Sequence, residues 1–165
     1  SYSEIYWPTY VFAFLLITGG VVGYWKVIAL TVNKVSSRRR IARGEEVSVA
    51  LHIRNRSREV DKVIARDLVP EGFSITSSFA TVKPVIRKIA EGTELVWRVG
   101  KLKKQEERVL HYRIKALRDF AGRIHIPSAH IKAEYEDGKE LIRRSNILFL
   151  HAHPSPISVI SVKVE

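Results

Sequence analysis

Residues beyond Lys26 alternate between apolar and polar side chains, the pattern of strands with one buried face. In Glu45–Arg54 every second residue from Val47 to Ile53 is apolar. In Arg108–Leu117 the set that begins at Leu110 forms the better apolar face. The strands predicted in this way are Val27–Val35, Glu45–Arg54, Val60–Val69, Phe73–Ser78, Thr81–Lys88, Glu94–Val99, Arg108–Leu117, Arg123–Ala133 and Leu141–Leu150.

Turn signals separate these strands at short intervals. Pro70-Glu71-Gly72 is expected to end one strand, and Glu136-Asp137-Gly138 to close a hairpin. Many short strands with frequent turns are typical of a β-sandwich or barrel, and no long amphipathic helical pattern interrupts them. The sequence therefore predicts a mainly β domain over residues 27–150.

The first part of the chain has a different pattern. From Tyr6 to Trp25 it carries no charge, and a helix of that length would cover about 30 Å, the thickness of a bilayer core. Aromatic pairs stand at both ends, as at two membrane interfaces, and two glycines have the GxxxG spacing of close helix packing. We predict a hydrophobic, transmembrane-type helix over residues 1–26. Its marker residues are Tyr6, Trp7, Gly19, Gly23, Tyr24 and Trp25.

Three other interpretations of this apolar stretch remain open. It has the hydrophobicity of a leader, although the small-residue cleavage site is missing. Thr9–Ile17 and Val21–Val32 also suit a β-hairpin that turns at Gly19. A buried core helix is the third interpretation.

The last residues, 151–165, form a tail interrupted by Pro154 and Pro156. Ile157–Val164 then alternates again and has no obvious hairpin partner. We expect an edge strand that pairs within the chain or with a neighbouring subunit. Its apolar residues are Ile157, Val159, Val162 and Val164.

The composition of the chain excludes several kinds of functional site. The 165 residues include no Cys, which excludes disulfides, thiolate metal sites and a thiol nucleophile. The motifs of dinucleotide, P-loop, zinc-protease and serine-hydrolase sites are absent from the sequence. We therefore expect no enzyme, no catalytic residue and no cofactor.

Histidines and acidic residues give little evidence for a metal site. His151 and His153 would share one face of a strand, but no third ligand can be named. His125 and His130 would lie on opposite faces of one predicted strand. The acidic residues near Asp137 lack calcium-loop spacing. We expect no metal.

Asn55-Arg56-Ser57 is an N-glycosylation sequon in a predicted loop between strands. Asn55 is therefore a candidate glycosylation site.

Residues 45–150 contain an ordered set of turn and core residues, which are Asn55, Asp67, Pro70, Gly72, Phe73, Trp97, Gly100, Leu102, Tyr112, Gly122, Pro127, Ala129, Asp137, Ser145 and Asn146. This set resembles the immunoglobulin-like conserved repeat domain of archaeal and bacterial cell-surface proteins, which occurs in S-layer-related proteins. The resemblance implies an immunoglobulin-like β-sandwich, outside the cytoplasm, with a structural or adhesive role. The chain departs from it in being solitary and strongly basic.

The formal net charge of +11 raises the question of partners and orientation. The positive-inside rule would place the sandwich in the cytoplasm, whereas the resemblance places it outside, which we favour because large domains translocate regardless of charge. Nucleic acid is disfavoured, since no aromatic residues interleave with the basic ones. A glycan or acidic partner suits the charge better. The predicted interaction patch comprises Arg38, Arg39, Arg40 and Arg43.

Two functions follow from this organisation. The first is a non-catalytic extracytoplasmic structural subunit, a pilin-like filament or cell-surface protein that self-associates through its apolar helix and sandwich. The second is a single-pass accessory subunit of a larger membrane complex, with the sandwich as docking module. Both expect copies of the chain or other membrane-complex subunits as partners.

Overall fold

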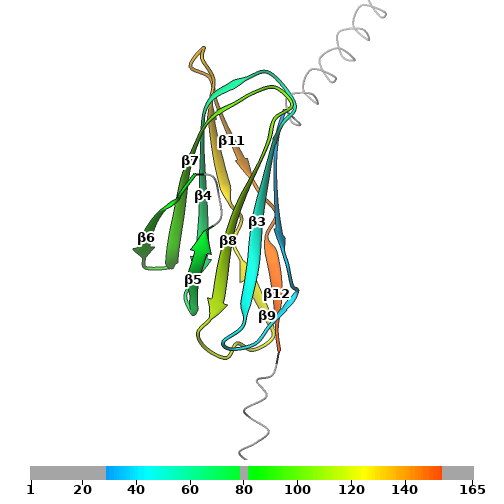
Figure 1. Ribbon diagram of the computed structural model, residues 1–165, viewed down its shortest axis with the longest axis vertical. Coiled ribbons are helices and arrows are strands. Elements are labelled where there is room, and N and C mark those ends of the chain that lie inside the picture. The colour runs from blue at the N-terminus through cyan, green and yellow to red at the C-terminus, as the bar shows by residue number, and fades with distance from the viewer. Residues whose placement is uncertain (1–28, 79–81, 154–165) are drawn as a thin grey trace, which may run out of the picture.

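The computed structural model describes residues 29–78 and 82–153. All secondary-structure elements of this described part are strands, and they form three sheets (Figure 1). The strands are β1 (Leu30–Ser36), β2 (Arg40–Ile41), β3 (Glu46–Asn55), β4 (Val60–Pro70), β5 (Phe73–Ser78), β6 (Val85–Ile89), β7 (Gly92–Leu102), β8 (Glu107–Ala116), β9 (Arg123–Ile126), β10 (His130–Glu134), β11 (Glu140–Arg144) and β12 (Leu148–Ala152). The prediction of a mainly β domain is confirmed.

Two larger sheets pack face to face. One has the order β1-β3-β8-β5 and the other the order β11-β10-β4-β7-β6. One hydrophobic core joins residues of both sheets. At its centre Trp97 of β7 meets Tyr112 of β8 with ring centroids 5.9 Å apart, and both side chains are fully buried. A third sheet, β2-β12-β9, lies beside them.

The alternating strands bury the faces that their sequences predict. In β3 the apolar residues from Val47 to Ile53 are buried, and in β8 those from Leu110 to Ala116 are buried. The two strands pair antiparallel, with Val49 opposite Tyr112. Because one face of each strand is apolar, the register is set by burial of that face.

The predictions of single strands over Arg123–Ala133 and Leu141–Leu150 are wrong. Each segment forms two strands that belong to different sheets, β9 and β10 in the first case and β11 and β12 in the second. Pro127 cannot donate a ladder hydrogen bond, so the first strand breaks there. The second breaks beside it, where Ser145 N–H donates to the Ala129 carbonyl (2.9 Å) and the Ser145 hydroxyl accepts from Ala129 N–H (2.8 Å).

This break also corrects the placement of two histidines. His125 lies in β9 and His130 begins β10, so they occupy strands of different sheets rather than two faces of one strand. Smaller differences concern strand ends: β6 covers Val85–Ile89, and β7 extends over Gly92–Leu102 because its pairing with β4 continues to both ends. The expected turn at Asp137 is confirmed between β10 and β11.

The predicted apolar helix over 1–26 lies outside the described residues, as does the candidate edge strand Ile157–Val164. The described part of the chain contains no helix with the length and apolar character that a membrane crossing requires.

Candidate functional site

A buried ion pair joins the two large sheets. Lys34 of β1 and Asp67 of β4 approach to 2.7 Å between Nζ and Oδ1, and both side chains have an exposed fraction of 0%. The Lys34 amine also donates to the Pro127 carbonyl at 2.8 Å. A lysine and an aspartate are almost never fully buried unless they are paired, so this contact identifies an unusual position in the core.

Tyr112 completes what we call the buried charge cluster, which consists of Lys34, Asp67 and Tyr112. Its hydroxyl donates to the second carboxylate oxygen of Asp67 at 2.5 Å. The Leu68 backbone N–H donates to Oδ1 at 2.9 Å. Asp67 therefore has hydrogen-bond donors on both oxygens, which is the condition for keeping a carboxylate in a core.

Burial controls the protonation of this cluster. It lowers the pKa of the Lys34 amine and raises the pKa of the Asp67 carboxyl, and the attraction between the two groups opposes both shifts. Burial, reinforced by the neighbouring Asp67 charge, raises the pKa of Tyr112 well above its usual value. The phenol therefore stays protonated and remains a donor to Asp67.

The backbone of Lys34 is held as firmly as its side chain. Its N–H donates to Oδ1 of Asn146 at 2.8 Å, and its carbonyl accepts from Nδ2 of Asn146 at 2.9 Å. The Asn146 side chain thus pairs with the free edge of β1 as another strand would. Lys34 connects β1 to β4, to the Pro127 crossing and to the segment before β12.

The buried charge cluster is suited to holding the two large sheets together rather than to catalysis. A general acid or base must reach a proton of a bound substrate, and these side chains are enclosed within the sandwich. No group of three or more metal-ligating side chains is positioned to hold an ion within residues 29–78 and 82–153. His151 and His153 are exposed, and only His151 lies within a strand.

The sequence contained a signal for the cluster that periodicity makes visible. Lys34 is in phase with Leu30 of β1, and Asp67 is in phase with Ala65 and Val69 of β4. A charged residue on the apolar face of an alternating strand indicates a buried, paired group. Asp67, Tyr112 and Asn146 are among the residues that carry the family resemblance. Lys34 is not among them, so the sequence analysis does not identify it as a core residue.

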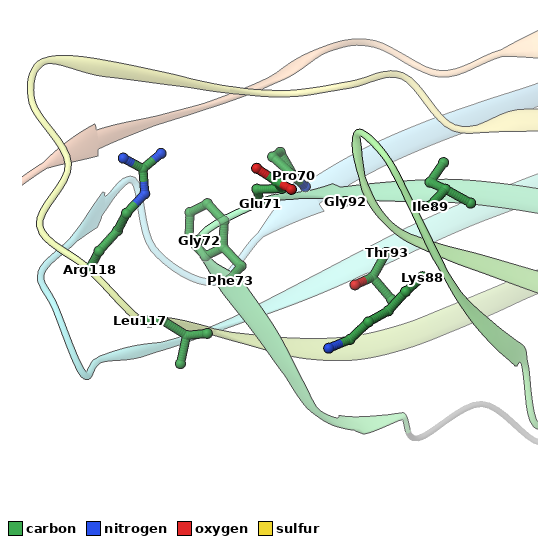
Figure 2. Close-up of a pocket in the computed structure, with 10 residues that line it drawn as sticks. All are labelled: Pro70, Glu71, Gly72, Phe73, Lys88, Ile89, Gly92, Thr93, Leu117 and Arg118. Atoms are coloured by element: carbon green, nitrogen blue, oxygen red, sulfur yellow. The ribbon is translucent and has the colours of Figure 1, made fainter.

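A surface pocket of about 600 Å³ lies at one end of the sandwich (Figure 2). The turn from Pro70 to Phe73 forms one side, the hairpin from Lys88 to Thr93 another, and Leu117 with Arg118 a third. Among the described lining residues Glu71 is the one carboxylate. The lining therefore contains no pair of carboxylates for general acid–base hydrolysis.

The predicted basic patch is exposed around β2. Arg38 pairs with Glu45 at 3.1 Å, and both side chains are at least 40% exposed. The Arg39 carbonyl accepts from His151 N–H at 2.7 Å, so the patch lies beside the end of β12. Arg40 and Arg43 are also exposed. The four arginines are thus brought to one end of the domain, where charge repulsion is relieved by solvent.

Asn55, the candidate glycosylation site, is completely buried. Its Nδ2 donates to the carbonyls of Arg58 (2.9 Å), Leu102 (3.2 Å) and Lys103 (3.1 Å). Its Oδ1 accepts from Ser57 N–H at 3.1 Å. A glycan on Nδ2 would replace a donor that this turn uses, so the structure argues against the predicted modification.

We expect Asn55 to be unmodified in the native protein. The reason is that its amide nitrogen is enclosed and fully used, whereas a glycan needs an exposed attachment point. The mass of the proteolytic peptide that contains Asn55, taken from protein purified from its own host, checks this. A hexose-containing mass ladder on that peptide would show that the turn adopts a different structure before modification.

Comparisons with known proteins define the class of the fold. No family model matches the sequence, and no curated protein matches it. The structure is similar to BcpA, the major pilin subunit of Bacillus cereus, with a TM-score of 0.55 and 11% identity over 74% of this chain and 40% of that chain. It is also similar to a non-cellulosomal cohesin from the hyperthermophilic archaeon Archaeoglobus fulgidus, with a TM-score of 0.51 and 8% identity over 81% of this chain and 99% of that one.

A third similar structure is a putative membrane anchored protein from Corynebacterium diphtheriae, with a TM-score of 0.53 and 8% identity over 76% of this chain and 36% of that one. The described domain therefore has the β-sandwich fold of pilin and cohesin modules. This chain spans less than half the length of the pilin chain that it matches.

Proposed function

We propose that the chain is a non-catalytic structural subunit outside the cytoplasm, which self-associates through its apolar N-terminal segment and its sandwich. The single observation that carries this proposal is how the core is built: the buried charges of Lys34 and Asp67 and the Tyr112 hydroxyl bind one another instead of a substrate. Its fold is shared with a pilin and with a membrane-anchored protein, which supports a location at the cell surface.

The five-stranded sheet has a surface for self-association at its outer strand β6. Among the described residues β6 has a strand partner on one side alone, because it ends the sheet order. Val85 and Ile86 are 65% and 53% exposed. The other end of β6 carries the charged residues Arg87 and Lys88, so the apolar part of this edge is its Val85–Ile86 end. An open strand edge is a template for another strand. We assign the tail segment Ile157–Val164 of a neighbouring copy to this edge, by β-strand addition.

The resemblance to S-layer-related surface domains fits the same function. The apolar stretch that contains Gly19 and Gly23 would carry the contact between subunits in a membrane or in a filament core. The basic patch around Arg38–Arg43 would face an acidic partner or glycan.

The proposal predicts polymers at the cell surface. Gentle shearing of cells should release filaments of this chain, visible by negative-stain electron microscopy. Ile86→Lys should abolish or strongly shorten them, because it replaces an exposed apolar side chain of this edge by a charge beside Arg87 and Lys88, which β6 already carries. Ile142→Lys is the matched control, since Ile142 is 60% exposed on β11 at the other edge of the same sheet.

The alternative gives a different result in the same experiment. An accessory subunit with the sandwich as docking module would stay in the membrane fraction with other polypeptides at fixed ratio. Replacing Arg39, Arg40 and Arg43 by Ser would then release those polypeptides. The exposure of these arginines at the end of the domain is the observation that favours this second candidate.

Filaments that form equally well with Ile86→Lys would contradict the assignment of the tail segment to the β6 edge.

A further inference from the structure

The described chain enters the sandwich at one end and leaves it at the other (Figure 1). The Ala29 carbonyl accepts from Arg56 N–H, just beyond the end of β3, while His153 N–H donates to the Ile41 carbonyl near the start of β3. Strand β3 has 10 residues, so the two ends are separated by roughly 33 Å.

The first and last strands run side by side in the same direction. Lys34 is bonded to Asn146, the Arg39 carbonyl accepts from His151 N–H, and β2 pairs parallel with β12. The residue numbers increase in the same direction on both sides of this contact, as they do in a parallel pair of strands. We call it the β1/β12 seam. Lys34 of β1 lies on one side with Arg39 and Ile41 of the following segment, which contains β2, and Asn146, His151 and His153 lie on the other.

Tension between Ala29 and His153 acts along this seam. Pulling Ala29 away from His153 draws the segment of β1 and β2 past β12, because β2 and β12 are parallel and the two segments are pulled from opposite ends. The hydrogen bonds across the seam are then loaded together. In a peeling geometry they would break one after another, and each bond contributes only about 1 kcal/mol.

Lys34 anchors the loaded strand in the facing sheet. Its amine bonds to Asp67 of β4 and to the Pro127 carbonyl, and neither contact lies in the sheet of β1. Sliding β1 would therefore have to remove a charge from its buried partner, which is costly in a medium of low dielectric constant. The seam and the buried charge cluster resist the same displacement.

We propose that the β1/β12 seam, anchored by Lys34, is a mechanical clamp that lets the domain carry tension between its two ends. This deepens the proposed structural role and rests on it for its biological use. The clamp itself is a property of the single chain, so it is measured without polymers. Filament formation and clamping can therefore fail independently.

Single-molecule force spectroscopy on the full chain tests the clamp. The sequence has no cysteine, so pairs of introduced cysteines are unique handles. Ala29→Cys with His153→Cys loads the seam in shear. Ala29→Cys with Lys104→Cys places both handles at the same end of the sandwich. Asn55 N–H donates to the Glu106 carbonyl, so the β7–β8 turn that contains Lys104 lies beside the end of β3, where Ala29 also lies. Pulling these two residues apart peels β1 away from its neighbours. We expect a higher unfolding force in shear than in peeling.

Asn146→Ala removes two seam bonds at an exposed residue, so it is expected to fold even if Lys34 variants do not. At constant force in shear it should unfold about tenfold faster or more. Asn33→Ala, at an exposed asparagine of β1 beside Lys34, is the matched control and should leave the rate unchanged. Equal forces in the two pulling directions, or equal rates for the two variants, would overturn the proposal.

Discussion

Asp67→Ala is expected to lower the free energy of unfolding by about 3–5 kcal/mol, because it leaves the Lys34 amine in the core without its carboxylate. Tyr112 would also lose the acceptor of its hydroxyl. Denaturant unfolding monitored by tryptophan fluorescence measures the change, since Trp97 lies against Tyr112. A loss this large would be a substantial part of the stability of a domain of this size.

Two controls separate the buried charge from the loss of side-chain volume. Glu45→Ala breaks the exposed pair with Arg38 and should change the free energy by less than about 1 kcal/mol. The triple replacement Lys34→Met, Asp67→Leu and Tyr112→Phe removes all members of the cluster and should recover most of the stability lost in Asp67→Ala. If Asp67→Ala proved as mild as Glu45→Ala, the pair would have to be open to water in solution.

Gly92→Ala is expected to destabilise the domain by about 2–4 kcal/mol through combined backbone strain and overlap. Gly92 has a φ of +149°, and a Cβ built there would lie 2.1 Å from the Val69 carbonyl oxygen. That oxygen belongs to β4, whose Pro70 pairs with Gly92, so neither strand moves aside without breaking the ladder. Thermal or denaturant unfolding measures the loss.

Gly100→Ala is the matched control for Gly92→Ala in the same strand. Gly100 has a φ of +82°, but nothing lies within 4 Å of an added Cβ. This variant therefore isolates the cost of a left-handed backbone, about 1–2 kcal/mol, without the overlap. Equal losses for the two glycines would mean that the β4–β7 end relaxes freely. The pocket in Figure 2 would then be able to change shape, because Gly92 lines it.

The function proposed here depends on the enclosed character of the sandwich. Lys34, Asp67 and Tyr112 bind one another in its core. Its surface has an open strand edge at β6 and a basic end, and the described chain enters and leaves at opposite ends (Figure 1). Such features suit the proposed domain that joins subunits and carries tension between its two ends. The filament assay and the pulling experiment address these two aspects separately.

The alternation of side chains by itself determined most of the strands and their buried faces, but it did not indicate β2. The apolar sets in β3 and β8 lie inside as their period of two requires, because a half-buried strand must hide one face. The turns at Gly72 and Asp137 were also local, since their chemistry is set by neighbouring residues. The turn at Asn55 shows the limit of local motifs, because the sequon alone does not reveal that its amide is buried.

The tertiary structure alone decided which distant groups meet. Two alternating segments pass from one sheet to another at Pro127 and Ser145, and periodicity is the same on both sides of such a crossing. The pairing of Lys34 with Asp67 follows from packing of sheets, where contacts join residues with no fixed spacing in the chain. Local patterns record which face of a strand is buried, whereas the partner across the core depends on how the sheets are stacked.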